Sequence, residues 1–309
     1  MRFLVQCCFI FSLLLFSCNT QNQSTNSENK TQISATPKLT ARNFDYQPPI
    51  PVNGKLFAAI ELGALGLNYF IVEIDDQNRW SLKASSYGRS NIIYGVNTTN
   101  EIITKISEFR NEIIEYGVSP ANIHIIASSS AVQASIVDKL KIELSKQKRH
   151  LDYINSKDEG QYALIATIPR EFINESFLVD IGSGNTKLSW IEEDDTLSID
   201  IHGSKYFLGD VQDTTVFREV RDAILEIPEK NRTLCFMLGG MIYEFIKDEI
   251  EQNENRYFVL KSPGEYPSDN EKLRAANVIY NALYLEPTYS YIFDSQSNFS
   301  IGYLISLDK

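Results

Sequence analysis

The stretch Phe177–Glu192, FLVDIGSGNTKLSWIE, decides the fold. An apolar run typical of a buried strand ends at an acid, Asp180, and a turn of small and polar residues, GSGNT, follows at 182–186. Apolar and polar residues then alternate, with Leu188 and Trp190 on one face. This pattern predicts a strand, a glycine turn and a second strand.

The glycine turn carries groups that suit an anion. Gly182 and Gly184 allow positive φ and a close approach of the backbone to a ligand, and successive N–H groups of such a turn can form a concave anion site. Ser183 and Thr186 add hydroxyl donors. Asp180 can hold a hydrated Mg²⁺ ion, which prefers oxygen ligands. The alternative interpretation is an ordinary hairpin closed by a Gly-Asn turn.

A second copy of this pattern occurs earlier in the chain, at Phe57–Asp75, FAAIELGALGLNYFIVEID. Glu61 and Gly63 stand where the later copy has Asp180 and Gly182. Two copies of one supersecondary unit indicate a duplication. We therefore expect two α/β domains whose turns face each other across a cleft.

The pair of turns resembles the two phosphate loops of the actin, heat-shock ATPase and sugar-kinase superfamily. Within it, the resemblance is strongest to the exopolyphosphatase / guanosine pentaphosphate phosphatase family, which has segments like D-x-G-S-N-S, A-T-S-A-x-R, I-S-G-E-E-E-A-R and D-I-G-G-G-S-T-E, and then a glycine pair. Similar segments occur here in the same order, at residues 61–66, 127–133, 154–161, 180–187 and 238–240. The resemblance implies an α/β fold of two duplicated ribonuclease-H-like, actin-like ATPase domains.

The same resemblance implies a Mg²⁺-dependent phosphoanhydride hydrolase. Glu159 falls on the family's catalytic glutamate, the general base for the attacking water, and Asp180 with Glu61 would hold the metal. Gly239 and Gly240 fall on a turn that contacts the nucleoside. The residues expected to contact phosphate are Gly63, Ser129, Gly182, Ser183, Gly184 and Thr186. Two structural alternatives stay open: a first-turn carboxylate that favours a helix dipole for Glu159, and a tight strand–helix connection for the glycine pair.

The first turn departs from the family pattern. Ala64, Leu65 and Gly66 replace Ser-Asn-Ser, so only backbone N–H groups remain as donors, and Gln133 replaces an arginine that would clamp phosphate. Losing one donor to developing charge commonly costs ~10²–10³ in rate. The second hypothesis is therefore a catalytically degenerate lipoprotein that binds a phosphate-containing ligand or a protein partner. An ATPase or a sugar kinase ranks third, because nucleotide is scarce outside the cytoplasm.

The N-terminus predicts export and lipidation. Arg2 precedes an apolar run, Phe3–Phe16, that is too short for a typical membrane span. The sequence LFSC that ends at Cys18 resembles the bacterial lipobox, so we expect residues 1–17 to be a signal peptide and Cys18 to carry the lipid. The alternatives are a plain secretory signal and an anchor helix. The expected location is the bacterial cell envelope, facing the periplasm or the surface, with the lipid as the only membrane contact.

The segment 18–48 is rich in Asn, Gln, Ser and Thr, and we expect a disordered tether there. The two expected domains follow at 49–168 and 169–309. Cys235 is the only cysteine beyond Cys18, which excludes an intramolecular disulfide in the globular part.

The formal net charge of −11 disfavours nucleic acid and anionic membrane surfaces as partners. It also counts against a long polyanion unless the cleft is locally basic. The expected ligand is a phosphate-containing small molecule or polyphosphate. The three histidines, His124, His150 and His202, have neither the spacing of a zinc site nor the partners of a serine-hydrolase triad.

Local signals place several elements. Thr98 and Glu101 match a capping box and open a helix that Gly117 ends. A helix is expected over 131–148. The segment 290–307 has the pattern of two strands.

Overall fold

The computed structural model describes residues 44–307, except 96, 267, 285–287 and 289. These residues belong to one compact unit, Leu39–Lys309. The predicted signal peptide, the lipidation site Cys18 and the tether up to residue 43 lie outside the described residues. No helix in the described part of the chain is long and apolar enough to cross a membrane.

The first half of the chain forms a five-stranded sheet and the helices that follow its strands. The strands are β1 (Lys55–Leu62), β2 (Gly66–Ile74), β3 (Trp80–Arg89), β4 (Ile123–Ala127) and β5 (Asp152–Tyr153), and the helices are α1 (Thr99–Tyr116), α2 (Ser129–Val132) and α3 (Ile136–Lys146). The strand order is β3-β2-β1-β4-β5. The first three strands are antiparallel, and β4 lies parallel to β1.

The second half forms a six-stranded sheet. Its strands are β6 (Ser176–Ile181), β7 (Asn185–Glu192), β8 (Asp195–His202), β9 (Leu234–Leu238), β10 (Tyr257–Val259) and β11 (Ser290–Asp294), and its helices are α5 (Asp213–Glu226), α6 (Gly240–Gln252) and α7 (Glu271–Leu283). The strand order is β10-β11-β9-β6-β7-β8. The first three strands are again antiparallel, and β9 lies parallel to β6.

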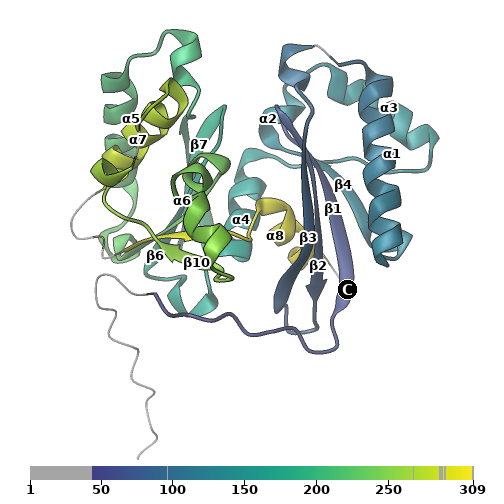
Figure 1. Cartoon of the computed structure of the whole chain (residues 1–309), viewed down its shortest axis with the longest axis horizontal. Coiled ribbons are helices and arrows are strands. Elements are labelled where there is room, and N and C mark those ends of the chain that lie inside the picture. The colour runs from purple at the N-terminus through teal and green to yellow at the C-terminus, as the bar shows by residue number, and fades with distance from the viewer. Residues whose placement is uncertain (1–43, 96, 267, 285–287, 289, 308–309) are drawn as a thin grey trace, which may run out of the picture. The chain divides into compact units, whose positions relative to one another are not determined.

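The two sheets therefore repeat one topology, in which a central strand has an antiparallel meander on one side and a parallel strand on the other. Helices α1 and α3 cover the outer face of the first sheet, and α5, α6 and α7 cover the outer face of the second (Figure 1). In β1, Ala58 and Ile60 point into the outer core, while Phe57 and Ala59 point into a core shared by both sheets. This duplicated, ribonuclease-H-like α/β arrangement confirms the predicted fold class.

Two helices occupy the space between the sheets, α4 (Ser156–Thr167) and α8 (Phe299–Ser306) (Figure 1). They pack so closely on each other that a Cβ at Gly302 would overlap the carbonyl of Tyr162. Helix α4 comes from the predicted first domain, 49–168, yet it contacts β7 and β8 of the second sheet. Helix α8 ends the chain and contacts β1 and β2 of the first sheet. Helices on each side of residue 168 in the sequence therefore pack against the sheet formed by the other half of the chain.

Helix α8 overturns the prediction of a second strand in 290–307. The first predicted strand is present as β11, but Phe299–Ser306 is helical. Seven of its residues are buried, 299–305, so no amphipathic period marks it in the sequence. The side chain of Asn298 accepts from the N–H of Ser300 and caps the helix.

The other local predictions fare differently. The capping box of Thr98 and Glu101 is present, and Gly117 ends α1 with φ of 111°. The helix predicted over 131–148 is divided into α2 and α3 by a break after Val132.

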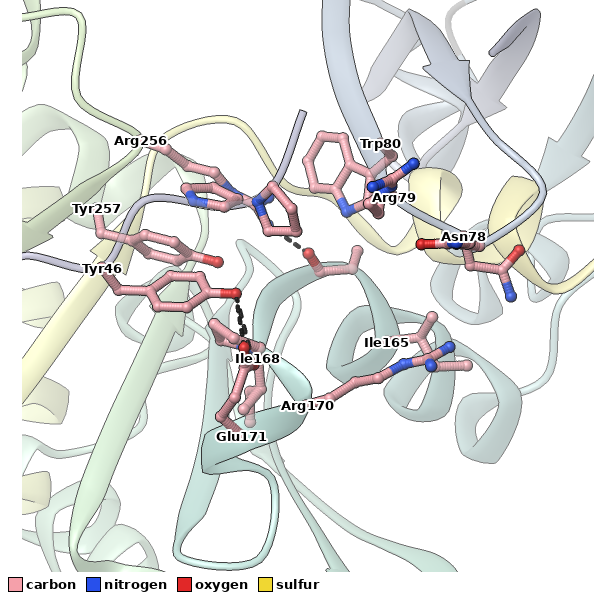
Figure 2. A pocket seen from close by; sticks show the side chains of 15 residues that line it. Tyr46, Asn78, Arg79, Trp80, Ile165, Ile168, Arg170, Glu171, Arg256 and Tyr257 are labelled. Carbon is pink, nitrogen blue, oxygen red and sulfur yellow. Dashed lines mark hydrogen bonds between the residues drawn. The ribbon is translucent and has the colours of Figure 1, made fainter. Parts of the chain in front are cut away.

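The prediction of a disordered tether is wrong for its last residues. Phe44 is buried, at 8% exposure, and its ring lies 5.3 Å from the ring of Phe172. The hydroxyl of Tyr46 donates to the carboxylate of Glu171 at 3.2 Å (Figure 2). These aromatic rings supply the apolar surface that the preceding Asn/Ser-rich segment lacks, so the chain becomes ordered here.

Candidate functional site

The turns after β1 and β6 are closed by the same hydrogen bond. In the first turn, the N–H of Gly63 donates to the carbonyl of Gly66 at 2.8 Å, and in the second the N–H of Gly182 donates to the carbonyl of Asn185 at 3.0 Å. Each turn follows the central strand of its sheet. The duplication seen in the sequence therefore extends to the backbone of the two turns.

In each turn, a serine one or two residues after the third strand of the sheet holds the carbonyl of the closing glycine. After β3, Ser90 donates its hydroxyl to the Gly63 carbonyl and its N–H to the Leu65 carbonyl, both at 2.8 Å. After β8, Ser204 donates its N–H and hydroxyl to the Gly182 carbonyl at 2.9 and 3.1 Å. Sequence reasoning missed both serines, since a serine after a strand is a weak signal.

Tying the carbonyl groups back leaves several N–H groups of the turns without acceptors. Among the described residues, the backbone N–H groups of Ala64, Leu65, Ser183 and Gly184 donate to nothing. All of these residues line one cavity of about 650 Å³. Unpaired N–H groups at a concave surface attract an anion. Both predicted turns therefore border the same cavity and offer it backbone donors.

Three carboxylates line this cavity, those of Glu61, Glu159 and Asp180. The carboxylate of Glu61 accepts from the hydroxyl of Ser300 at 2.9 Å, and that of Glu159 accepts from the N–H of Ser129 at 2.9 Å. Glu61 and Glu159 are 7% and 9% exposed, whereas Asp180 is half-buried. The sequence predictions for these acids thus converge on one place in the fold.

The ionisation of two of these acids is suppressed. Burial raises the pKa of Glu61 to about 7; the charges of Glu159 and Asp180 add to this rise, and the hydrogen bond from Ser300 opposes it. Burial and the charge of Glu159 raise the pKa of Asp180 to about 6, while Lys187 opposes that shift. A cation bound between the carboxylates would reverse both shifts.

Asp180 and Glu61 suit a Mg²⁺ ion that binds together with substrate phosphate. They do not form a complete metal site by themselves. Among the described residues, no group of three or more His, Cys, Asp and Glu side chains could hold a metal ion. Mg²⁺ needs less than that, because it keeps several waters and often takes only one or two protein carboxylates plus substrate phosphate. Asp180 and Glu61, whose pKa values are raised by burial and by neighbouring carboxylates, match this requirement.

A buried lysine, which sequence reasoning did not single out, lies beside the acids. Lys187 is directly opposite Asp180 on β6 and Asp200 on β8. Its ammonium group donates to Asp200 and to the hydroxyl of Ser156, both at 2.5 Å. Ser156 begins α4, the helix that carries Glu159. The lysine therefore anchors the first turn of α4 to the second sheet. The family pattern D-I-G-G-G-S-T-E has glutamate at the position of Lys187.

Glycine at position 160 allows α4 to approach the sheet this closely. A Cβ there would overlap the hydroxyl of Ser198, and it would lie 2.7 Å from that of Ser189 and 3.2 Å from Cδ of Lys187.

Two predicted phosphate ligands do not line the cavity. Thr186 is fully buried, and its hydroxyl has no hydrogen-bond partner among the described residues. It lies on β7 with its side chain on the face of Leu188, away from Lys187, because successive residues of a strand alternate between faces. Ser129 contributes its N–H to Glu159, while Ser128 and Ser130 line the cavity in its place.

The predicted glycines line the cavity, but not for the reason that the sequence suggested. Gly182 and Gly184 do not have positive φ. Gly182 is required because a Cβ would lie 2.7 Å from the Asn185 carbonyl. Gly239 has φ of 107°, a conformation that favours glycine, and it packs against the end of β6. Gly239 and Gly240 both line the cavity.

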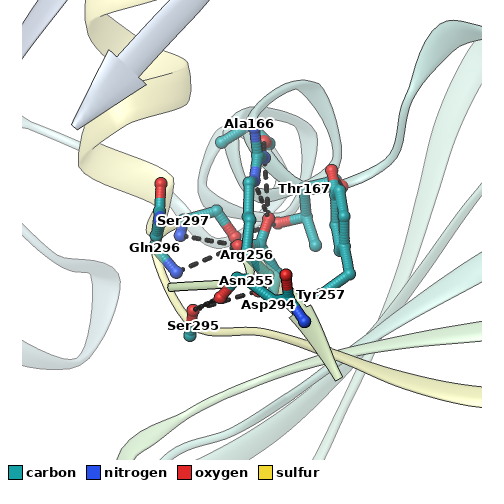
Figure 3. A network of polar contacts seen from close by, with 9 residues as sticks. All are labelled: Ala166, Thr167, Asn255, Arg256, Tyr257, Asp294, Ser295, Gln296 and Ser297. Atoms are coloured by element: carbon teal, nitrogen blue, oxygen red, sulfur yellow. Dashed lines mark hydrogen bonds and ion pairs between the residues drawn. The ribbon is translucent and has the colours of Figure 1, made fainter. Parts of the chain in front are cut away.

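A second cavity, of about 510 Å³, shares no lining residue with the first (Figure 2). Arg256 lines it, and its guanidinium donates to Asp294 at 2.7 and 2.9 Å and to the Ala166 carbonyl (Figure 3). The guanidinium also lies 4.0 Å from the ring centre of Trp80. Trp80 belongs to the first sheet and Asp294 to the second. This cluster connects the sheets, so we assign it to stability.

No family model matches the chain, and no curated protein matches it. Among solved structures, it is similar to a PPX-GPPA enzyme of Aquifex aeolicus, with 16% identity over 82% of this chain and 99% of that one and a TM-score of 0.64. An exopolyphosphatase from Cytophaga hutchinsonii matches with 14% identity, the same 82% of this chain, 99% of its own and a TM-score of 0.59. The chain therefore has the fold of the Ppx/GppA phosphatases, which confirms the resemblance at the level of the fold.

Proposed function

We propose that the chain is a phosphoanhydride hydrolase that holds a terminal phosphate between its two turns. The observation that supports this proposal is the set of unpaired N–H groups, from Ala64, Leu65, Ser183 and Gly184, around one cavity that also contains carboxylates. Such fixed dipoles stabilise charge that develops on a phosphoryl group without having to reorganise. The Ppx/GppA fold adds support, since two solved structures with this fold are named as a Ppx/GppA phosphatase and an exopolyphosphatase.

Glu159 is the proposed general base. One of its oxygens is fixed by the N–H of Ser129, which orients the carboxylate and leaves the other oxygen for water. A carboxylate so placed can accept a proton from the water that attacks the terminal phosphate. Lys187 and Ser156 hold the first turn of α4 and so position this base.

Asp180 and Glu61 are the proposed Mg²⁺ ligands. When bound, Mg²⁺ supplies positive charge that neutralises phosphate oxygens in the transition state. The chain's own contribution is to bring two carboxylates to the ends of β1 and β6, beside the unpaired N–H groups.

Phosphate release with Mg²⁺ tests the proposal, with polyphosphate, guanosine pentaphosphate and ATP as substrates. Glu159→Gln should abolish release, because the amide cannot take the proton. The matched control is Asp158→Asn, which changes the neighbouring acid on the same helical turn but does not touch the cavity. Release that survives Glu159→Gln would remove the base from the proposal, and no release from any substrate would remove the hydrolase for this panel.

A second function, binding without turnover, is favoured by one observation. The first turn presents Ala64 and Leu65 to the cavity, so half of the cradle has backbone donors only. A degenerate binder would show a rise in melting temperature with a phosphate ligand and no hydrolysis.

We further propose that lipid on Cys18 anchors the protein in the bacterial envelope, on the sequence pattern alone. The Cys18→Ala chain should then lose acyl labelling and leave the membrane fraction. Labelling that persists in this variant would contradict the proposal.

A further inference from the structure

The cavity between the turns has an acidic interior and an apolar mouth. Glu61 and Glu159 are nearly buried, whereas Tyr94 and Leu208 line the same cavity and remain 57% and 65% exposed. A residue that lines a cavity and keeps most of its surface exposed lies at the entrance. Tyr94 and Leu208 come from the two opposite halves of the chain, so apolar surface borders the entrance from both sides.

Further apolar side chains continue this surface inward. Leu65 belongs to the first turn and is tied to the segment of Tyr94, since the N–H of Asn91 donates to the Leu65 carbonyl at 3.1 Å. Val211 follows Leu208 and packs on the core of the second sheet. A ligand that leads from the N–H cradle to solvent therefore passes hydrocarbon surface.

The cavity has little free positive charge for a long polyanion. Lys187 is paired with Asp200, and His202 shares a hydrogen bond with Glu219 at 2.7 Å. Of the lysines and arginines that line the cavity in the described part of the chain, Lys205 alone has no ion pair. Each additional phosphate of a polyphosphate adds charge that must be compensated. The site can compensate a short phosphate group, but not a long chain.

We propose that the preferred substrate is a short organic diphosphate that bears a hydrocarbon group. This inference rests on the proposed function. The diphosphate lies in the N–H cradle, and the hydrocarbon lies against Leu65, Tyr94, Leu208 and Val211. Water attacks the terminal phosphorus and the P–O–P bond breaks. The products are inorganic phosphate and an organic monophosphate. Glu159 takes the proton of the water, so no oxidant, reductant or other co-reactant is needed.

The test compares geranyl diphosphate with ADP, inorganic pyrophosphate and long-chain polyphosphate, each with Mg²⁺. We expect the highest kcat/KM with geranyl diphosphate. Leu208→Ser should lower the ratio of kcat/KM for geranyl diphosphate over inorganic pyrophosphate about tenfold, the size of effect that the loss of an apolar contact has in a binding pocket. Leu225→Ser is the matched control, since Leu225 is 63% exposed on α5 and does not line the cavity.

Binding to the Glu159→Gln chain separates failure of the substrate class from failure of the hydrolase. A larger rise in melting temperature with geranyl diphosphate than with the other ligands, without turnover by the unsubstituted chain, would sustain the ligand class and remove catalysis. Better hydrolysis of long polyphosphate or of ADP would sustain the hydrolase and overturn the ligand class. Equal loss of the ratio in Leu208→Ser and Leu225→Ser would also overturn it, as would no shift with geranyl diphosphate.

Discussion

The first and second turns have the same backbone and different side chains. Both close through a glycine N–H, at 2.8 and 3.0 Å, and both are held from behind by a buried serine, Ser90 or Ser204. The first turn places Ala64 and Leu65 at the cavity, while the second places Ser183 and Gly184 there. The comparison teaches that strand ends and glycine determine where N–H groups point, whereas the side chains determine what else the ligand meets.

Charge is distributed as unequally as the side chains. Glu61 on the first turn is bonded to Ser300, a neutral hydroxyl. Asp180 on the second turn lies opposite Lys187, which lowers its pKa against the effect of burial. The second turn therefore keeps its acid more readily ionised and better suited to a metal ion.

The largest expected effect follows from this difference. We expect Asp180→Asn to lower the rate of phosphate release by about 10²–10³-fold, the loss typical for a group that stabilises developing charge. Glu61→Gln should cost less, because Glu61 is partly protonated at neutral pH without Mg²⁺ and must lose that proton before it can bind the ion. Rates measured across a Mg²⁺ titration check this, and equal losses in the two variants would contradict the asymmetry.

The acids should also give the two turns different pH signatures in Mg²⁺-free buffer. The pKa of Glu61 rises from 4.5 to about 7 in the folded chain, so the folded state binds the proton more tightly. Its contribution is present at low pH and is lost as the pH rises from about 4.5 to about 7. Glu61→Gln should therefore gain stability relative to the unsubstituted chain over this range, by up to about 3 kcal/mol.

For Asp180→Asn the corresponding window is lower, from about 3.8 to about 6. Melting temperatures measured against pH, with a chelator present, distinguish the two windows. A gain in stability, relative to the unsubstituted chain, that grows as the pH falls would contradict the prediction for either variant.

The glycines that close the turns should not be equally sensitive. A Cβ at Gly182 would lie 2.7 Å from the Asn185 carbonyl, whereas a Cβ at Gly63 would meet its nearest atom at 3.4 Å. We expect Gly182→Ala to lower the free energy of unfolding by about 1–3 kcal/mol, the usual cost of overpacking, and Gly63→Ala to lower it less. Urea unfolding of both variants measures this, and a larger loss in Gly63→Ala than in Gly182→Ala would contradict the prediction.

The smallest expected effect concerns the serines behind the turns. Ser90→Ala should cost ~1 kcal/mol, the usual net value of a hydrogen bond, or somewhat more. The Gly63 carbonyl has no other donor among the described residues, whereas the Gly182 carbonyl keeps the N–H of Ser204 in Ser204→Ala. Ser204→Ala should therefore cost less, and a larger loss in that variant would reverse the comparison.

The residues predicted from local pattern line the cavity where the prediction depended only on their position along the backbone. Glu61 and Asp180 lie near the ends of β1 and β6, and Gly63 and Gly182 follow these strands. The two strand ends border one cavity. Thr186 does not line the cavity. Successive residues of a strand point to opposite faces, and a turn motif does not specify which face of the following strand lines the cavity. Lys187 was missed because a lysine after a turn is usually exposed, and only the strand partners Asp180 and Asp200 explain its burial.

The sequence by itself determined the repeated strand–turn–strand units, the acids that end their strands and the capped helix α1, because these depend on residues close together in the chain. Only the tertiary structure decided that α4 and α8 fill the space between the sheets, that Ser300 bonds Glu61, and that apolar side chains line the cavity mouth. These contacts join residues far apart in the sequence, and their energy comes from burial and from hydrogen bonds that exist only once both partners are placed.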